Sequence, residues 1–462
     1  MFDHLIHELG SALENNQRII PSFKNALAKA RVTMASNFEA GVSTDLLIKA
    51  NSDFMDDIMR LAWNRFNWTE NRTSWRKSRI SLLAVGGYGR QELLPNSDID
   101  LLILLERNNQ SAHRDNIQSF TTLLWDIGLE VGHSVRSIAE CKPSALHDVT
   151  ILTAMMESRT ILGDGALCKK VQQKIAPGRS WSAKSFYLAK RQEQNGRHEK
   201  SNHTEYSLEP NVKTSPGGLR DIQTLTWVAR RRYGTQNITE LAEQDILTLE
   251  ESEELIKAQS NLWKIRFALH LLTNKDENRL LFEYQQALAG QFGFTDNDQL
   301  AVEQFMQSYY RTAHRVNTIN ETLLQHFDEV LVQANTRLQV RAVNDRFRLV
   351  NNLLEVTSES VFADEPSALL EMFVIVGSDE SIGGFRASTI RLARHHVYLI
   401  DTHFRENPKN AELFMTLLGS TNHLFTQLRR MGRWGILGAY LPEFGRIIGQ
   451  MQFDLFHIYT VD

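Results

Sequence analysis

The sequence predicts an α+β domain with a mixed sheet, followed by an all-helical domain. Short apolar runs at 79–86, 99–105 and 129–135 have the length and composition of buried strands, and a helical pattern covers 117–127. From about residue 181 onward, helical spacing dominates and strand patterns nearly vanish. The 462 residues exceed what one hydrophobic core normally organises, so we expect several domains.

The divisions follow from changes in apolar spacing along the chain. Near the N-terminus, Phe54, Ile58 and Leu61 recur every three or four positions, which predicts helix. Prolines and a glycine pair at 207–221 predict a loop inside the later helical part. We expect a helical segment at 1–66 and the α+β domain at 67–175. A helical domain containing that loop should follow at 176–335, then a helical connecting region at 336–450 and a short C-terminal segment at 451–462.

Composition excludes several classes of protein. The net charge of −4 gives no overall basic excess, so we expect no nucleic-acid partner. Two cysteines, Cys141 and Cys168, cannot form a disulfide framework or a cysteine-based zinc site, and they fit a reducing compartment. The N-terminus does not resemble a signal peptide, and no apolar run approaches the roughly 20 residues of a membrane span. We therefore expect a cytoplasmic protein without a membrane partner.

The clearest motif is a glycine-rich turn followed by two alternating acids. Residues 85–90 contain three glycines between two predicted strands, and Asp98 and Asp100 open the second strand. Strand residues alternate between faces, so the two carboxylates point the same way. Two like charges held close are costly unless a cation lies between them, and oxygen ligands favour Mg²⁺ or Mn²⁺. We predict a divalent-metal site at this pair.

The same motif offers a place for phosphate groups. Glycines present backbone N–H groups without side-chain bulk, and an arginine adds a charge-assisted contact. Together with the metal site, this layout fits metal-dependent transfer of a nucleotide. The predicted nucleotide-binding residues of the motif are Gly86, Gly87, Gly89, Arg90 and Ser97.

Other interpretations of the motif are a plain hairpin or a different nucleotide fold. For a lone pair of alternating acids, a β-hairpin with Gly and Asp as turn formers is the commoner explanation. Here the glycine pair, the short gap and both flanking strands occur together, which favours function. A dinucleotide fingerprint is excluded because Glu92 stands at its third glycine position, and no Gly-Lys-Ser/Thr of a P-loop follows.

A glycine pair, a short gap and two alternating aspartates resemble the signature of the nucleotidyltransferase superfold, the polymerase-β-like fold. The fuller strings 86–93 and 97–102 resemble one family in particular, the bifunctional uridylyltransferase/uridylyl-removing enzymes of the PII nitrogen-signalling protein. Gln91 departs from the pattern, which has glycine there. Further strings that resemble this family lie at 131–136, 157–159, 163–164, 208–222 and 449–457, so the resemblance covers essentially the whole chain.

The resemblance implies a reaction and a partner. UMP would pass from UTP to a tyrosine hydroxyl of the PII protein with Mg²⁺ as cofactor, and pyrophosphate would leave. The family also has a His-Asp phosphohydrolase domain that removes UMP, and glutamine-sensing domains after it. The resemblance implies that 451–462 is the truncated start of this hydrolase domain, because the sequence ends at Asp462 and His457 alone cannot make the hydrolase. We therefore expect transfer activity without the hydrolase activity.

Two further sets of residues are candidates for the site. Such enzymes usually place a third carboxylate on the next strand, where Glu130 is the first choice, with a possible role as general base, and Glu157 a weaker one. A solvated surface glutamate is an about equal alternative for Glu130. In the 207–221 loop, Lys213, Arg220 and Asp221 are predicted to close over the nucleotide, although a structural turn with ordinary surface charges also fits. His198 and His203 are interpreted as solvated.

Three rival functions remain open. A protein adenylyltransferase of the type that modifies glutamine synthetase would use ATP as donor. A non-catalytic nucleotide-binding regulatory module would bind nucleotide without turnover, but the intact Asp98 and Asp100 argue against it. A tRNA or poly(A) nucleotidyltransferase would need a basic surface for RNA, which the net charge of −4 does not favour.

Overall fold

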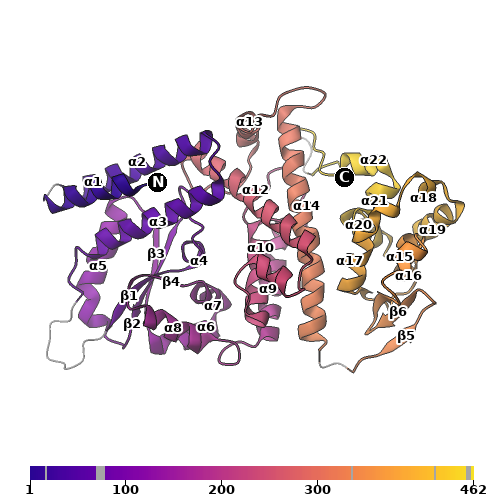
Figure 1. Cartoon of the computed structure of the whole chain (residues 1–462), viewed down its shortest axis with the longest axis horizontal. Helices are drawn as coiled ribbons and strands as arrows, with labels where there is room; N and C mark the ends of the chain where they lie inside the picture. The colour runs from indigo at the N-terminus through magenta and orange to yellow at the C-terminus, as the bar shows by residue number, and fades with distance from the viewer. Residues whose placement is uncertain (16–17, 69–78, 335–336, 421–422, 454–458, 462) are drawn as a thin grey trace. The chain divides into compact units, whose positions relative to one another are not determined.

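The computed structural model describes residues 1–15, 18–68, 79–334, 337–420, 423–453 and 459–461 (Figure 1). The chain divides into two compact units. Within the described residues, no helix is both long and apolar enough to cross a membrane. Unit 1 comprises Met1–Lys190, Arg230–Gly234 and Ser260–Asn278, and unit 2 comprises Arg191–Ala229, Thr235–Gln259 and Arg279–Asp462.

Unit 1 begins with the helices expected before residue 66. On the second of them, buried side chains recur every three or four positions from Phe23 to Phe38, which is the apolar stripe of an amphipathic helix. The third helix buries a larger share of its surface, including the polar side chains of Asn51 and Asp56. The helices are α1 (Asp3–Glu14), α2 (Ile19–Glu39) and α3 (Thr44–Trp63).

The predicted mixed sheet is confirmed in unit 1. Its strand order is β3-β2-β1-β4, where β2 and β3 are parallel and β1 is antiparallel to both of its neighbours. Three strands match the apolar runs in the sequence, with the third two residues later than expected, and the fourth was not assigned from sequence. The strands are β1 (Ile80–Ala84), β2 (Ile99–Leu105), β3 (Val131–Ser137) and β4 (Arg159–Gly163).

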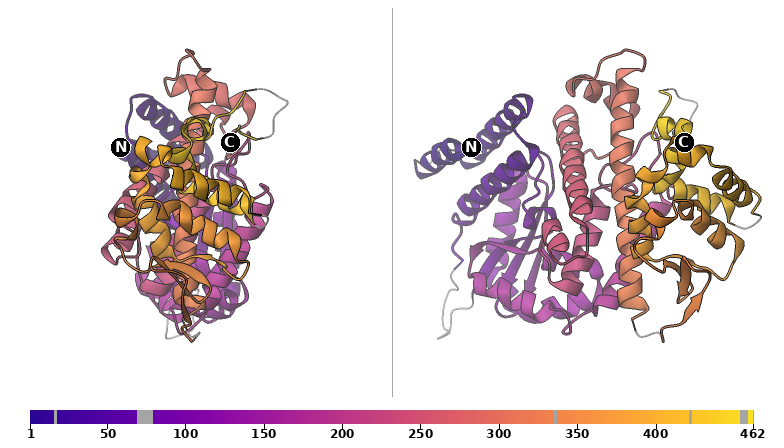
Figure 2. Two further views of the ribbon diagram at one scale, coloured as in Figure 1. Left: turned by 90° about the vertical axis from the view of Figure 1, so that its right-hand side faces the viewer. Right: turned by 45° about the vertical axis from the view of Figure 1, so that its right-hand side comes forward.

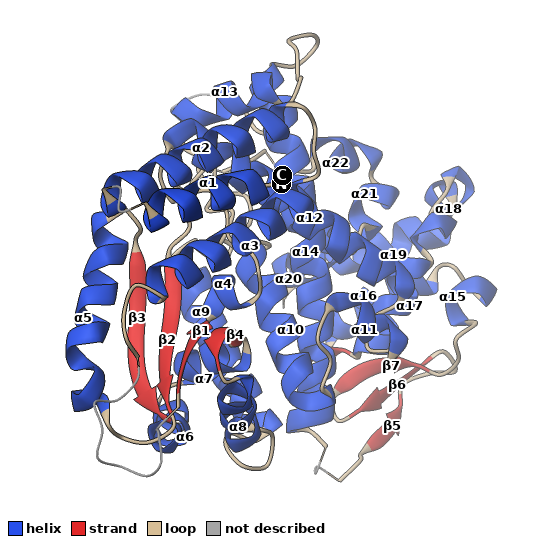
Figure 3. Ribbon diagram, turned by 60° about the vertical axis from the view of Figure 1, so that its left-hand side comes forward, coloured by secondary structure: helices blue, strands red, loops and turns tan. Residues whose placement is uncertain are grey.

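Both faces of this sheet are covered. Five consecutive residues of β2, Leu101–Leu105, are buried, so neither face of the strand meets solvent there. Figure 3 shows α5 beside β3, while α8 packs on β1 and β2. The helices that accompany the sheet are α4 (Gly86–Gly89), α5 (Gln110–Asp126), α6 (Ile138–His147), α7 (Val149–Met156) and α8 (Gly165–Ile175).

The helical part expected after residue 181 is also present, and the division between the units passes through three of its helices, α9, α10 and α12. In unit 2, buried side chains run along the whole length of α14, and a short π-helix, Asp328–Val332, follows it directly. The loop predicted at 207–221 is present as far as residue 218, and its last three residues form the start of α10. The helices are α9 (Ala183–Glu199), α10 (Leu219–Tyr233), α11 (Ile238–Glu243), α12 (Leu249–Thr273), α13 (Phe282–Gln291) and α14 (Ala301–Phe327).

The connecting region expected to be helical at 336–450 also contains strands, which the sequence did not predict. A second sheet of four strands, ordered β5-β6-β7-β8, lies there. Its strands have two to four residues and carry charged cross-strand neighbours such as Arg348 and Glu355, so no continuous apolar run marks them. The strands are β5 (Val340–Ala342), β6 (Phe347–Val350), β7 (Leu353–Val356) and β8 (Gly384–Phe385).

Short helices cover this second sheet, which appears in orange in Figure 2. A shared apolar core includes Phe347 from β6, Phe373 and Trp434. It makes the region after residue 340 a folded layer of sheet and helix within unit 2. The helices are α15 (Val361–Asp364), α16 (Ala368–Ser378), α17 (Ala387–His395), α18 (Thr402–Glu406), α19 (Pro408–Leu418), α20 (Leu424–Arg433), α21 (Ile436–Tyr440) and α22 (Pro442–Ile447), with a 3₁₀ turn at Val397–Leu399.

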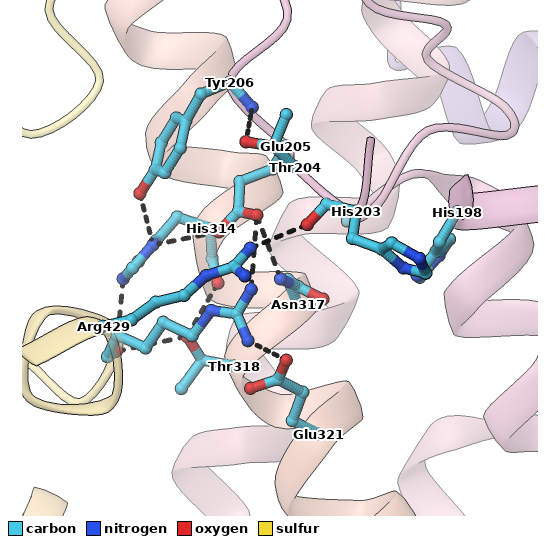
Figure 4. A network of polar contacts seen from close by, with 12 residues as sticks. His198, His203, Thr204, Glu205, Tyr206, His314, Asn317, Thr318, Glu321 and Arg429 are labelled. Atoms are coloured by element: carbon cyan, nitrogen blue, oxygen red, sulfur yellow. Dashed lines mark hydrogen bonds and ion pairs between the residues drawn. The ribbon is translucent and has the colours of Figure 1, made fainter. Parts of the chain in front are cut away.

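A buried polar network joins the segment before the 207–221 loop to α14 and α20 (Figure 4). Glu205 is 1% exposed, accepts a hydrogen bond from Asn317 at 3.2 Å, and lies 3.7 Å from the Arg433 guanidinium. His314 Nδ1 lies 3.6 Å from the same carboxylate and 2.9 Å from the Tyr206 hydroxyl. Burial by itself raises the pKa of Glu205, but the contacts with His314 and Arg433 outweigh it and bring the pKa to about 2.

The charged form of Glu205 therefore stabilises unit 2. Because its pKa falls from 4.5 to about 2 on folding, this stabilisation is present above about pH 4.5 and is lost as the pH falls toward 2. We expect Glu205→Gln to lower the free energy of unfolding at pH 7 by on the order of 3 kcal/mol, with a difference from wild type that shrinks between about pH 5 and pH 3.

Urea unfolding at several pH values measures this difference. Glu412→Gln is the matched control, because Glu412 is exposed on α19. A difference between Glu205→Gln and wild type that stays constant over this pH range would contradict the role of Glu205.

Candidate active site

The two aspartates of the motif lie where β2 begins, next to the single helical turn α4 that follows β1. The carbonyl of Asp100 accepts a hydrogen bond from the Val85 N–H at 3.0 Å, which ties the turn to the strand. Ile99 and Leu101 are buried, whereas Asp98 and Asp100 are exposed. The two carboxylates thus lie on the same, solvent-facing side of the strand, as its alternation predicts.

The carboxylate of Asp100 occupies space that two glycines leave open. A Cβ atom built on Gly86 would lie 3.1 Å from Asp100 Oδ2, and one built on Gly132 would lie 2.8 Å from Oδ1. Gly132 is the direct neighbour of Asp100 across the parallel β2–β3 pair. Gly86 also needs its positive φ of 59° to start the turn. Sequence analysis did not single out Gly132, although a glycine inside a strand often marks such a close approach.

Glu130 lies beside Asp98. The register pairs Ile99 with Val131, and the Ile99 N–H donates to the Glu130 carbonyl at 2.9 Å. Extending this register by one residue sets Glu130 next to Asp98, and its side chain is exposed. The first choice for a third carboxylate therefore lies on the strand beside the aspartate pair.

Arg90 is already paired with two carboxylates. Its Nε lies 2.8 Å from Glu92 and its Nη1 lies 2.7 Å from the buried Glu157. Burial disfavours the charged guanidinium, but the two carboxylates outweigh this effect, so the pKa of Arg90 lies above its ordinary value. Glu157, the weaker candidate for the third acid, therefore holds Arg90 in an ion pair, and the contact of Arg90 with nucleotide stays a prediction.

A buried ion pair anchors the glycine turn to α3. The Tyr88 hydroxyl donates to Asp56 at 2.7 Å, and Arg159 from β4 binds the same carboxylate at 2.5 and 3.0 Å. The Arg159 guanidinium also lies 5.5 Å from the centre of the Tyr88 ring. Burial and the charge of Asp56 hold the pKa of Tyr88 well above its usual range, so the phenol stays neutral. Three segments far apart in the sequence meet at this anchor, which sequence analysis did not detect.

Residues 91–98, between the glycine turn and β2, are held by a hydrogen-bonding side chain from α3 and by one of their own. Asn51 on α3 donates to the carbonyls of Leu93 and Leu94 at 3.0 and 3.2 Å. Ser97 uses its hydroxyl to accept from the Leu94 N–H at 3.2 Å, so it shapes the turn before Asp98. Gln91 has a positive φ of 61°, a conformation that glycine adopts most easily. This explains why the pattern of the family that the sequence resembles has glycine at this position.

The donor set fits a divalent metal. Two exposed carboxylates on one side of a strand supply the hard oxygen ligands that Mg²⁺ prefers, and the space around Asp100 is kept free of Cβ atoms. In the described part of the chain, no group of three or more His, Cys, Asp or Glu side chains is arranged to hold a metal. The candidate metal site therefore rests on the Asp98–Asp100 pair.

Asp221, predicted to bind nucleotide, organises the 207–221 loop from within unit 2. It is fully buried, and its carboxylate accepts hydrogen bonds from the Gly217 N–H at 2.8 Å and from Gln194 at 2.9 Å. Arg197 and His198 on α9 contact it as well. The expectation that His198 is solvated was therefore wrong, because its ring is committed to Asp221, whereas His203 is exposed as expected.

Lys213 in this loop and Arg220 in the first turn of α10 are joined through their backbones. The Arg220 N–H donates to the Lys213 carbonyl at 2.8 Å, and the Arg220 guanidinium lies 5.3 Å from the centre of the Trp227 ring. Both side chains are half-buried. Gly217 packs so closely on α14 that a Cβ atom would lie 2.1 Å from the Ala313 carbonyl. The loop is thus a fixed support that presents two basic residues, and their contact with nucleotide stays a prediction.

Comparison with known families agrees with the class that the sheet and the site define. Residues 67–155, which hold the glycine turn and both aspartates, match a family model described as a nucleotidyltransferase domain. Residues 185–324 match the model of GlnD PII-uridylyltransferase, and residues 347–440 match the third domain of uridylyltransferase GlnD. Three of the four strands of the second sheet, β6, β7 and β8, lie in the stretch that matches this third domain.

Relatives are similar along nearly the whole chain. A bifunctional uridylyltransferase/uridylyl-removing enzyme of Azotobacter vinelandii is 50% identical over 444 residues, which is 96% of this chain and 49% of that protein. Enzymes of the same name from Pseudomonas aeruginosa and Stutzerimonas stutzeri are 48% identical over the same shares. The chain thus spans about half the length of these relatives, and the resemblance to their family is confirmed. His457, which the resemblance includes, lies outside the described residues.

The anchor at Tyr88 gives a test of stability. We expect Tyr88→Phe to lower the free energy of unfolding of unit 1 by about 1.5–3 kcal/mol, because the buried Asp56 carboxylate loses a hydrogen-bond donor. Urea unfolding measures this change. Tyr309→Phe is the control, since the Tyr309 hydroxyl is buried without a hydrogen-bond partner in the described structure, and its removal should cost nothing. Equal effects of the two substitutions would contradict the anchor.

Proposed function

We propose that this chain transfers UMP from UTP to a tyrosine hydroxyl of a PII signal protein. The observation that carries the proposal is the Asp98–Asp100 pair, which opens β2 beside a glycine turn shaped around Asp100. The family models at 67–155 and 185–324 support the reaction class and the partner. Two free buried cysteines support a reducing compartment, and we propose that the reaction takes place in the cytoplasm.

Each residue of the site has a role in this reaction. Asp98 and Asp100 would hold Mg²⁺, which when bound polarises the phosphate and stabilises developing negative charge. Gly87 would leave room for the triphosphate, since a Cβ atom there would meet only the Arg90 side chain at 3.7 Å. Gly86 would act through the space that it leaves for Asp100. Gly89 would act through the shape of the turn, because a Cβ atom there would lie 2.3 Å from the Glu157 carbonyl. Glu130 would accept the proton of the tyrosine hydroxyl as that oxygen bonds to the α-phosphorus and pyrophosphate leaves.

Residues in contact with these groups position them. Arg90 would meet the triphosphate while Glu92 and Glu157 fix its guanidinium. Ser97 shapes the turn that delivers Asp98. In the 207–221 loop, Lys213 and Arg220 would contact the nucleotide, and the buried Asp221 would hold the loop in shape.

The reaction is tested with purified PII protein, Mg²⁺ and either UTP or ATP labelled at the α-phosphate. We expect label on PII from UTP only, and a rate at least about 100-fold lower in Asp98→Asn and Asp100→Asn, because each change removes a charged metal ligand. Asp115→Asn, a change at an exposed aspartate of α5, should label PII like wild type.

Other outcomes assign a rival function. Label from ATP alone would favour a protein adenylyltransferase. UTP binding in calorimetry without any transfer would favour the regulatory module. Full activity of Asp100→Asn would refute the metal site.

The space around Asp100 gives a second test. We expect Gly132→Ala to reduce transfer by about 10-fold or more, because the new methyl group displaces the Asp100 carboxylate from its position between the glycines. Gly165→Ala is the matched control, since a Cβ atom there meets nothing within 4 Å. Transfer assays and urea unfolding on both variants separate the effects. Unchanged transfer in Gly132→Ala, or an equal loss in Gly165→Ala, would contradict the steric requirement.

A further inference from the structure

A cavity with a basic lining lies wholly within unit 2, outside the nucleotidyltransferase domain. Its volume is about 380 Å³, within the range of pockets that hold small molecules. Four arginines line it from α9 and α20, and Glu321 is the one carboxylate among its described lining residues. The arginines are Arg191, Arg429, Arg430 and Arg433.

Two of these arginines are neutralised by the protein. Arg191 lies 2.8 Å from Asp328. Arg433 contacts Glu321 and lies 3.7 Å from the buried Glu205. Their charges are therefore already committed to the fold.

The hydrogen bonds of the other two arginines go only to neutral groups among the described residues. Arg429 donates to the carbonyl of His203 at 2.7 Å, as Figure 4 shows. Arg430 contacts the amide oxygen of Gln427 at 3.4 Å and lies 5.5 Å from the centre of the Phe385 ring. Burial lowers the pKa of Arg430, the charge of Arg433 lowers it further, and the attraction of Glu321 does not compensate. A bound anion would repay this unfavourable burial.

The balance of charge points the same way. Four arginines face the cavity, and three carboxylates contact them, namely Asp328, Glu321 and Glu205. The excess positive charge falls on the neighbouring Arg429 and Arg430. Aromatic and apolar side chains complete the lining, among them Phe385, Trp434 and Phe425, and Phe425 is 75% exposed. The cavity therefore combines an uncompensated basic group with an apolar wall.

We propose that this cavity binds a small molecule with a phosphate group, held by Arg429 and Arg430. Guanidinium groups form strong paired hydrogen bonds to phosphate oxygens. A phosphate offers three oxygens in different directions to donors on one helix, whereas a carboxylate offers two in one plane. The apolar wall favours a phosphate ester with a ring over free phosphate.

Calorimetry on the full chain in EDTA tests the site, because EDTA removes metal-dependent binding at Asp98 and Asp100. The probes are inorganic phosphate, phenyl phosphate and benzoate, the last two sharing a ring but differing in the anionic group. We expect saturable binding of both phosphates, tighter for phenyl phosphate, and benzoate binding at least about 10-fold weaker. This readout needs neither UTP nor PII, so failure of the transfer reaction does not affect it.

Substitutions locate the bound phosphate. Arg430→Gln should weaken phenyl phosphate binding about 10-fold or more, as should Arg429→Gln, which alters an exposed side chain and is expected to fold normally. Arg311→Gln, at an exposed arginine of α14, is the matched control and should bind like wild type.

Three results would overturn the proposal. The first is no saturable binding of either phosphate to wild type, and the second is benzoate binding as tight as phenyl phosphate. The third is binding that survives in Arg429→Gln but is lost in Arg220→Gln, which would locate the phosphate at the 207–221 loop.

Discussion

The clearance around Asp100 is the constraint on which the rest of the site depends. Its carboxylate fits only because Gly86 and Gly132 carry no side chain, and these glycines come from different elements. The turn after β1 must therefore take a left-handed conformation at Gly86, and β3 must pair with β2 in one register. A slip of one residue would bring Val131 or His133 opposite Asp100 and turn the strand's faces over. Local sterics at one carboxylate thus specify both a turn and a strand pairing.

The anchor at Asp56 extends this constraint beyond the sheet. It joins α3, the glycine turn and β4 through Tyr88 and Arg159 with short hydrogen bonds, and Asp56 and Tyr88 are buried. A buried carboxylate between a neutral phenol and a guanidinium is costly to disrupt, because each lost partner leaves a charge unsatisfied. The glycine turn therefore keeps its position through tertiary contacts, although four residues of helix with three glycines have little intrinsic stability.

Much of the candidate site was predictable from the sequence, and the reasons are local. The apolar run of β2 predicts a buried strand, and alternation then puts Asp98 and Asp100 on one side. The positioning contacts were not predictable, because Asp56 and Arg159 are 103 residues apart and neither lies in a recognisable pattern. Asp221 was predicted as a ligand because it stands in a distinctive loop, but burial shows that it shapes the loop. The second sheet was missed since strands of two to four residues have no measurable periodicity.

The position of Asp56 also decides how this protein can be divided. The sequence suggests a natural cut at residue 67, where the helical segment ends and the nucleotidyltransferase domain begins. A fragment starting there would lack all of α3, so Tyr88 and Arg159 would lose both the Asp56 carboxylate that binds them and the helix that covers them. It would also lose the hydrogen bonds that Asn51 donates to the carbonyls of Leu93 and Leu94, shortly before Asp98. We therefore expect a stable fragment of this domain to start before α3, so that its physical boundary differs from the boundary of the family model at residue 67.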